Sequence, residues 1–135
     1  METVSAHLAA AGLYVGLLIL MGIVLQMRVI RLRRSKLIGI GDGQDKELAR
    51  AIRVHGNFAE NVPVALAGLI MLALIDAQAI VIHGVGILLL TGRVLHAIGL
   101  TGSAGASKGR VGGMILTFTA LIVTALALIV IAIWR

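Results

Sequence analysis

The stretch Arg53–Pro63, RVHGNFAENVP, carries charged and amide side chains immediately before a long apolar run. Four of these side chains stand at positions i, i+4, i+7 and i+8, namely Arg53, Asn57, Glu60 and Asn61. At about 100° per residue, this spacing places them on one face of a helix. Charged groups are costly to expose to acyl chains. The pattern therefore predicts a polar stripe that points into a helix bundle, toward a neighbouring subunit or into a polar cavity.

A second polar set lies elsewhere in the chain. Arg93 and His96 are three residues apart in an apolar segment, Arg110 precedes the last apolar run, and Arg31 follows the first. Guanidinium groups offer carboxylates permanently charged, bidentate donors. Acidic residues to neutralise them are few, so the combined set favours a site for an anionic ligand, in which Glu60 suits an ammonium group. The alternative is an Arg–Glu–Asn network that only joins helices, and these residues alone leave both interpretations open.

Composition restricts the class of protein. The chain of 135 residues is 59% hydrophobic and only 13% charged, which is too apolar for a soluble domain of this length. It has no cysteine, so a disulfide framework and a thiolate metal site are excluded, and any thiol must come from a ligand. The histidines lack a metal-ligand spacing, so no metal site is predicted. The net charge of +6 is not accompanied by the aromatic platforms of a nucleic-acid-binding domain, and no nucleic acid is predicted as a partner.

The apolar runs predict an all-α integral membrane protein, a four-transmembrane-helix bundle that forms a single membrane domain over residues 1–135. The second run is long enough to span only if its helix begins near Lys46 and includes the polar stripe. The first run follows no basic segment, so it is expected to remain as a span and not to be cleaved as a signal peptide. The predicted helices cover residues 4–34, 46–75, 78–99 and 108–133.

The cations indicate an orientation. All lysines and arginines except Arg135 lie near the connections between the first and second helices or between the third and fourth. By the positive-inside rule these connections are cytoplasmic, and both termini lie on the non-cytoplasmic side. The interpretation is a multi-pass protein of a bacterial inner membrane, in contact with membrane lipid, with its site on the cytoplasmic side.

Four segments of the chain resemble one known family. AIRVHGNFAENVP is similar to the second-helix signature of the membrane-associated proteins in eicosanoid and glutathione metabolism, in which Arg, Asn and Glu recur at this spacing and proline follows. VIRLRRSK resembles the basic end of the family's first helix, GRVLHAIG its third-helix Arg-x-x-His segment, and SKGR the segment that carries its catalytic arginine. The resemblance covers nearly the whole chain in the family's order.

This resemblance implies a homotrimer of four-helix subunits that binds glutathione, as cosubstrate, between neighbouring subunits. Arg110 matches the catalytic arginine, which stabilises the glutathione thiolate. The second substrate is expected to be a hydrophobic electrophile or a lipid hydroperoxide that arrives from the bilayer. The residues implied or predicted to bind glutathione are Arg31, Arg53, Asn57, Glu60, Asn61, Arg93 and His96.

Two positions depart from the family pattern. Asn61 stands where many members have tyrosine after the motif glutamate, and Leu100 stands where prostaglandin-synthase relatives have tyrosine after the third-helix histidine. The site is therefore expected to lack phenolic donors. The function implied is a glutathione transferase of the membrane, with peroxidase activity as an extension. The alternative is a non-catalytic protein of the same fold that binds lipid or glutathione or assembles with a partner.

Overall fold

The computed structural model describes residues 2–103 and 105–134, and these residues form four α-helices. The helices are α1 (Glu2–Lys36), α2 (Lys46–Leu74), α3 (Ala79–Gly102) and α4 (Lys108–Trp134). Each is long and apolar enough to cross a membrane. The predicted ranges differ from these bounds by at most three residues. The predicted far-side cation, Arg135, lies outside the described residues.

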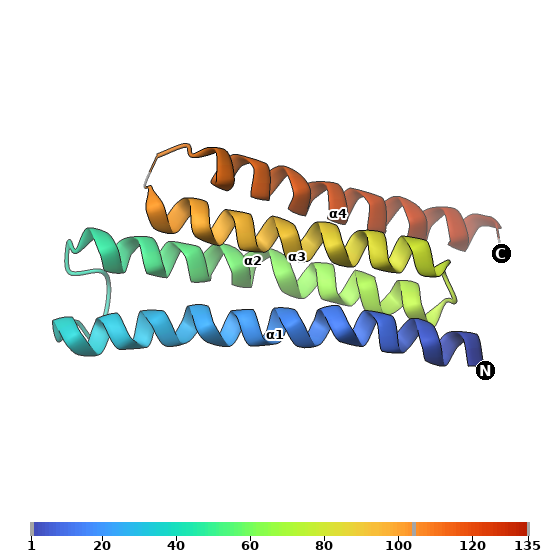
Figure 1. Cartoon of the computed structure of the whole chain (residues 1–135), viewed down its shortest axis with the longest axis horizontal. Helices are drawn as coiled ribbons and strands as arrows, with labels where there is room; N and C mark the ends of the chain where they lie inside the picture. The colour runs from blue at the N-terminus through green and yellow to red at the C-terminus, as the bar shows by residue number, and fades with distance from the viewer. Residues whose placement is uncertain (1, 104, 135) are drawn as a thin grey trace.

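The helices run alternately up and down, so the two chain ends lie at one end of the bundle and the α1–α2 and α3–α4 loops at the other (Figure 1). Among the described residues every pair of helices is in contact except α1 and α4. At the loop end, the α1–α2 hairpin extends beyond the α3–α4 loop, which leaves a step (Figure 1). Helix α1 has 35 residues, and at 1.5 Å per residue it is about 52 Å long, longer than the hydrocarbon core of about 30 Å.

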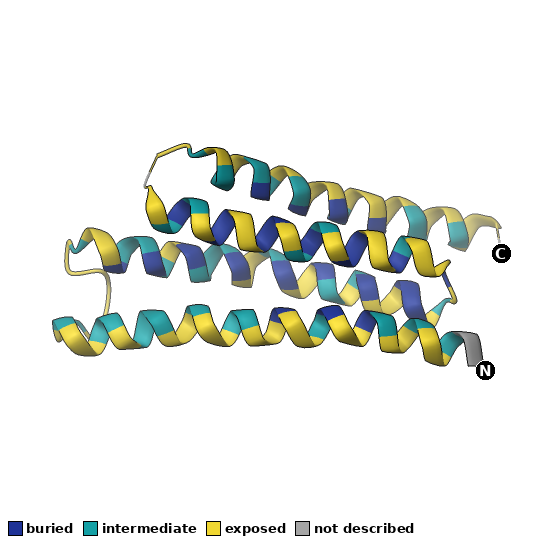
Figure 2. Cartoon of the chain, viewed as in Figure 1, coloured by how far each residue is buried: buried dark blue, intermediate teal, exposed yellow. Residues whose placement is uncertain are grey.

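The core is a layer of aliphatic side chains between the helices. Leu18 of α1, Leu69 and Leu72 of α2, and Ile82 and Leu89 of α3 are fully buried. The outward faces of α1 and α4 are exposed along most of their length (Figure 2). These faces are themselves apolar, which is the pattern of helices solvated by lipid, where polar surface residues are not required.

Glycines allow α3 and α4 to approach very closely. A Cβ atom added at Gly92 of α3 would lie 2.9 Å from the carbonyl oxygen of Gly113 in α4, and one at Gly113 would collide with the backbone nitrogen of His96. At Gly109 it would lie 3.1 Å from the carbonyl oxygen of Leu95. Backbone contact of this kind is a main source of helix association in lipid. Apolar side chains gain little free energy there by moving from acyl chains to another helix. The loop-end halves of α3 and α4 therefore form one tightly packed unit.

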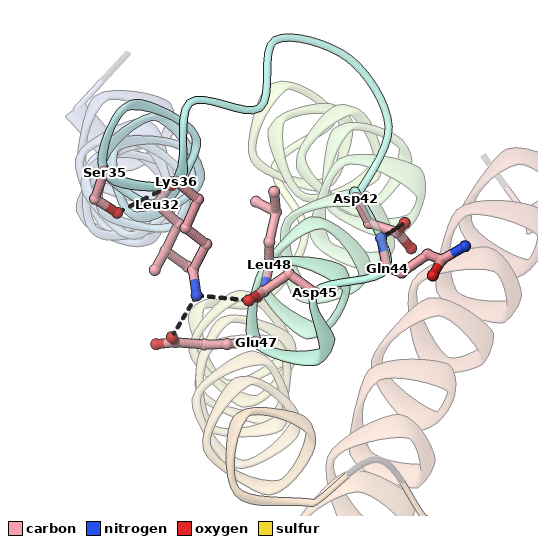
Figure 3. A network of polar contacts seen from close by, with 8 residues as sticks. All are labelled: Leu32, Ser35, Lys36, Asp42, Gln44, Asp45, Glu47 and Leu48. Atoms are coloured by element: carbon pink, nitrogen blue, oxygen red, sulfur yellow. Dashed lines mark hydrogen bonds and ion pairs between the residues drawn. The ribbon is translucent and has the colours of Figure 1, made fainter.

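The α1–α2 loop is held by ion pairs and by its helix cap (Figure 3). The ammonium group of Lys36, at the end of α1, lies 2.7 Å from Oδ2 of Asp45 and 3.5 Å from Oε2 of Glu47. Asp45 is also the N-cap of α2, because its Oδ1 accepts a hydrogen bond of 2.8 Å from the backbone N–H of Leu48. Arg33 donates to the loop carbonyl of Gly41 at 2.8 Å. The loop is thus fixed from both helices.

The hydrogen bond from Lys36, and then the one from the Leu48 backbone, hold the pKa of Asp45 below its ordinary value of 3.8. A lowered folded-state pKa means that this contact contributes stability above the ordinary value and loses it as pH falls through the folded value. We expect Asp45→Asn, which keeps an acceptor for Leu48 but not the charge, to lower Tm modestly at neutral pH, and Asp45→Ala to lower it further. Thermal unfolding of the detergent-solubilised protein, with Asp42→Asn as the control, measures both. Equal acid sensitivity of Asp45→Asn and the unchanged chain would contradict this account.

Candidate functional site

The most deeply buried charged group among the described residues is the guanidinium of Arg93 in α3, with a residue exposure of 1%. Its Nη2 donates to Oδ1 of Asn57 in α2 at 2.7 Å, and its Nη1 donates to Oγ1 of Thr117 in α4 at 3.3 Å. Nη1 also lies 3.8 Å from the sulfur of Met114. One side chain therefore joins three helices through neutral acceptors.

None of the described residues gives Arg93 a carboxylate partner, and its buried Nε has no hydrogen-bond partner among them. A buried cation without an anion is costly unless several dipoles solvate it. His96 supplies one of these dipoles, because its Nδ1 lies 3.2 Å from Nη2 of Arg93. A guanidinium has only donors, so Nδ1 must accept, and the ring is then the tautomer that carries its proton on Nε2. His96 is also buried, at 2% exposure.

The polar stripe of α2 divides between two surroundings. Asn57 faces inward, to Arg93, and Asn61 turns back on its own helix and donates to the backbone carbonyl of Asn57 at 2.8 Å. Arg53 and Glu60 face outward and form an ion pair of 3.2 Å, with both side chains more than half exposed. The outward pair is available to a ligand or to a neighbouring subunit, whereas the inward amides hold the bundle.

A cleft of about 300 Å³ opens at the step between the α1–α2 hairpin and the α3–α4 loop. We call it the basic cleft. Its lining includes no acidic residue. The lining residues are Lys46, Ala49, Arg50 and Arg53 of α2, Leu100 of α3 and Arg110 of α4. An adjoining cleft of about 570 Å³ shares Arg53 and also contains Glu60 and Asp42. Four cations line the basic cleft, and the adjoining cleft adds Arg33 and two carboxylates.

The predicted site residues therefore form two groups and one outlier. Arg53 and Arg110 meet in the basic cleft, with Glu60 beside Arg53. Asn57, Arg93 and His96 meet in the buried network, and Asn61 adjoins them through Asn57. Arg31 is exposed on α1 and lines neither cleft. The binding roles of these residues stay predictions.

Sequence reasoning missed the contribution of α4 to the buried network. Thr117 is completely buried, and its hydroxyl accepts from Arg93 and donates to the carbonyl of Gly113 at 2.8 Å. The available signal was a threonine one turn after Gly113, one of three threonines in a run that is otherwise apolar. In lipid such a hydroxyl pairs with its own helix or with a polar group of a neighbour. Here it does both.

Four membrane-spanning helices around a buried polar network, with a basic cleft at one end, define an α-helical multi-pass membrane protein. The chain belongs to the MAPEG family, whose family model matches residues 11–130. The family membership predicted from the four segments is thereby confirmed.

Curated relatives agree with this assignment. The chain is 36% identical, over 99 residues, to the inner membrane protein YecN of Escherichia coli strain K12, a match that covers 73% of this chain and 74% of the relative. The protein of the same name from E. coli O6:H1 matches with the same identity and coverage. Together with the four long apolar helices, these relatives confirm the predicted multi-pass inner-membrane location.

The buried network generates a test of what joins the helices. Asn57→Leu removes the shortest acceptor of the buried guanidinium and should destabilise the protein by about 1.5–3 kcal/mol, the usual range for a hydrogen bond to a charged group. Adding Arg93→Met removes the orphaned charge as well, so the double variant should be more stable than Asn57→Leu alone. Unfolding by titration with a denaturing detergent gives both values. A double variant less stable than either single variant would show that the charge itself is needed in the core.

Proposed function

We propose that this protein is a glutathione transferase of the membrane, which conjugates glutathione to hydrophobic electrophiles and reduces lipid hydroperoxides with the same thiolate. Membership of the MAPEG family supports a glutathione-related membrane function in general. The observation that carries the specific proposal is the basic cleft, in which Arg50, Arg53 and Arg110 converge with no acid in the lining.

The charges around the cleft suit this tripeptide. Glutathione has two carboxylates, one ammonium group and one thiol. Arg50 and Arg53 supply bidentate donors for the carboxylates, and Glu60, beside Arg53, supplies an acceptor for the ammonium. Binding requires the Arg53–Glu60 ion pair to open. Because both side chains are more than half exposed, that pair contributes little stability, and opening it costs little free energy.

Arg110 is the residue proposed to act on the thiol. A thiol with an ordinary pKa of about 8.5 is mostly protonated at neutral pH, whereas the thiolate is the nucleophile. The guanidinium of Arg110, in the wall contributed by α4, stabilises that anion while the proton leaves to water. The sulfur then attacks the electrophilic carbon, a C–S bond forms, and the leaving group departs with the bonding electron pair. With a hydroperoxide, the sulfur attacks the terminal oxygen, the O–O bond breaks, and the alkoxide takes up a proton and leaves as an alcohol. A second glutathione then attacks the sulfur of the resulting sulfenic acid, which forms the disulfide and releases water.

The buried residues have a different part in this proposal. Arg93 and His96 are enclosed by the chain itself, so they act by holding Asn57 and the α2 wall in place and not by touching the ligand in this conformation. Arg31 is exposed and does not line the cleft of its own chain, so its contribution in this proposal comes through a neighbouring subunit. A homotrimer with the loop ends in the cytoplasm meets this need and agrees with the concentration of cations at that end.

The first test removes the proposed catalytic guanidinium. With purified protein in detergent, glutathione should produce the ultraviolet absorbance of a thiolate, and a chloronitrobenzene electrophile should be conjugated. Arg110→Ala should lose the thiolate signal and at least tenfold in kcat/KM, which corresponds to about 1.4 kcal/mol. Arg34→Ala, an exposed arginine outside the cleft, is the matched control and should change neither.

Absence of a thiolate signal from the unchanged protein at saturating glutathione would remove the enzymatic proposal. In that case, glutathione binding measured by calorimetry would favour a non-catalytic binder of the same fold. Failure to bind it would favour a cleft that holds the phosphate groups of anionic lipids.

The second test concerns the ammonium group. Glu60→Gln should weaken the binding of glutathione several-fold and should weaken much less the binding of an analogue that lacks the γ-glutamyl ammonium, because only the former contains the group that the carboxylate recognises. Isothermal calorimetry on both ligands measures the two effects. Equal weakening would assign Glu60 to the support of Arg53 alone.

A further inference from the structure

A second concave site lies on the other flank of α2. It is a groove of about 360 Å³ lined by α1 and α2 only, and it shares no residue with the basic cleft. Its floor is the buried side chains of Leu18, Phe58 and Val62, and its exposed rim includes Ile23 and Pro63. All of these residues belong to the membrane-spanning segments, so the groove opens sideways to the bilayer.

One backbone oxygen on the wall of this groove lacks its helical donor. Pro63 has no N–H, so the carbonyl of Ala59, four residues earlier, cannot receive the usual hydrogen bond of an α-helix. Ala59 and Pro63 both line the groove. Helix carbonyls point toward the C-terminus, so this oxygen faces the section of wall between the two residues. No side chain among the described residues donates to it, and an unsatisfied carbonyl in hydrocarbon costs several kcal/mol, roughly the loss of a full hydrogen bond.

The polarity of the groove is graded along its length. His55 and Gln26 line it at the loop end, one turn from Ala59 and on the facing helix, whereas Leu18 and Leu66 line it deeper in the membrane. Because α1 and α2 are antiparallel, both helices become apolar in the same direction. A molecule with a polar head and one long apolar chain matches this gradient.

We propose that the α1–α2 groove binds a single-chain amphiphile whose head carries a hydroxyl group. The hydroxyl donates to the carbonyl of Ala59, and the chain lies along Phe58, Val62 and Leu18 toward the middle of the bilayer. A carboxylate or a methyl ether has no proton to donate, so the site distinguishes an alcohol from either. The groove contains neither Arg110 nor Arg53, so the proposal holds whether or not the protein conjugates glutathione.

The experiment uses the full-length protein in lipid nanodiscs and a photoreactive long-chain alcohol. Unlabelled alcohol should compete with the probe about three- to tenfold better than its methyl ether of equal chain length, the advantage of one hydrogen bond. Peptide mass spectrometry should place the adducts on α1 and α2 residues that line the groove. In Pro63→Ala the restored N–H occupies the Ala59 carbonyl, and the preference for alcohol over ether should fall to about one. Val64→Ala, an exposed neighbour, is the matched control and should keep the preference.

A second variant blocks the groove without altering Pro63. A Cβ atom at Gly22 would lie 3.0 Å from the ring of Phe58, so Gly22→Leu fills the space between the helices. It should abolish specific labelling by the alcohol and the ether alike. An unchanged alcohol preference in Pro63→Ala would overturn the proposal, as would a preference lost in His55→Phe but kept in Pro63→Ala, which would make the imidazole the acceptor.

Discussion

The arrangement of this bundle depends on one buried cation. Arg93 is enclosed by three helices and faces an amide, a hydroxyl, an imidazole and a thioether, with no carboxylate among the described residues. A charge in that position forces its neighbours to present oxygen or nitrogen lone pairs, which sets the rotation of α2 and α4 about their axes. Once Asn57 and Thr117 face α3, the opposite flanks of α2 and α4 are determined as well. The outward position of Arg53 and the position of Arg110 across the cleft follow from that rotation.

Hydropathy predicted the helices well because hydrocarbon leaves the backbone no alternative to internal hydrogen bonds, so four long apolar runs require four helices. The i, i+4, i+7, i+8 spacing correctly placed the polar residues on one stripe. The stripe is wide enough, however, for its two edges to face different surroundings. At 3.6 residues per turn, Glu60, Arg53, Asn57 and Asn61 are spread in that order over about 100° of the helix surface. The packing of α3 against α2 determines which side chains of the stripe are buried in the bundle and which are exposed. The boundary between the two falls between Arg53 and Asn57.

Because helix packing decides which residues are buried, the sequence predicted the members of the site better than their roles. A pattern of arginines indicates a site for an anion. It does not reveal which guanidinium is buried between helices, where it supports the fold, and which is accessible to a ligand. Arg93 and Arg53 look equivalent in the sequence, yet one is 1% exposed and the other lies at the surface. The contribution of Thr117 required knowing that glycines bring α4 against α3 at backbone contact, so that a short hydroxyl can reach across. The proposed contribution of Arg31 to the site requires a neighbouring subunit, and the sequence of one chain does not specify how subunits pack.

The step at the loop end has a kinetic consequence. The α1–α2 hairpin extends beyond the α3–α4 loop (Figure 1), and the cations of the basic cleft lie at this loop end, close to the first turns of α2 and α4. An anionic solute that approaches this end from water would meet the field of the cleft before contact. Its rate of capture would fall as ionic strength rises, because the field is screened over about 10 Å at 0.1 M salt. An uncharged molecule dissolved in the membrane is insensitive to that field and is concentrated instead by partitioning. If the cleft takes an anion from water and the bilayer supplies the second substrate, as proposed, the arrival of the first depends on salt concentration and the arrival of the second on hydrophobicity.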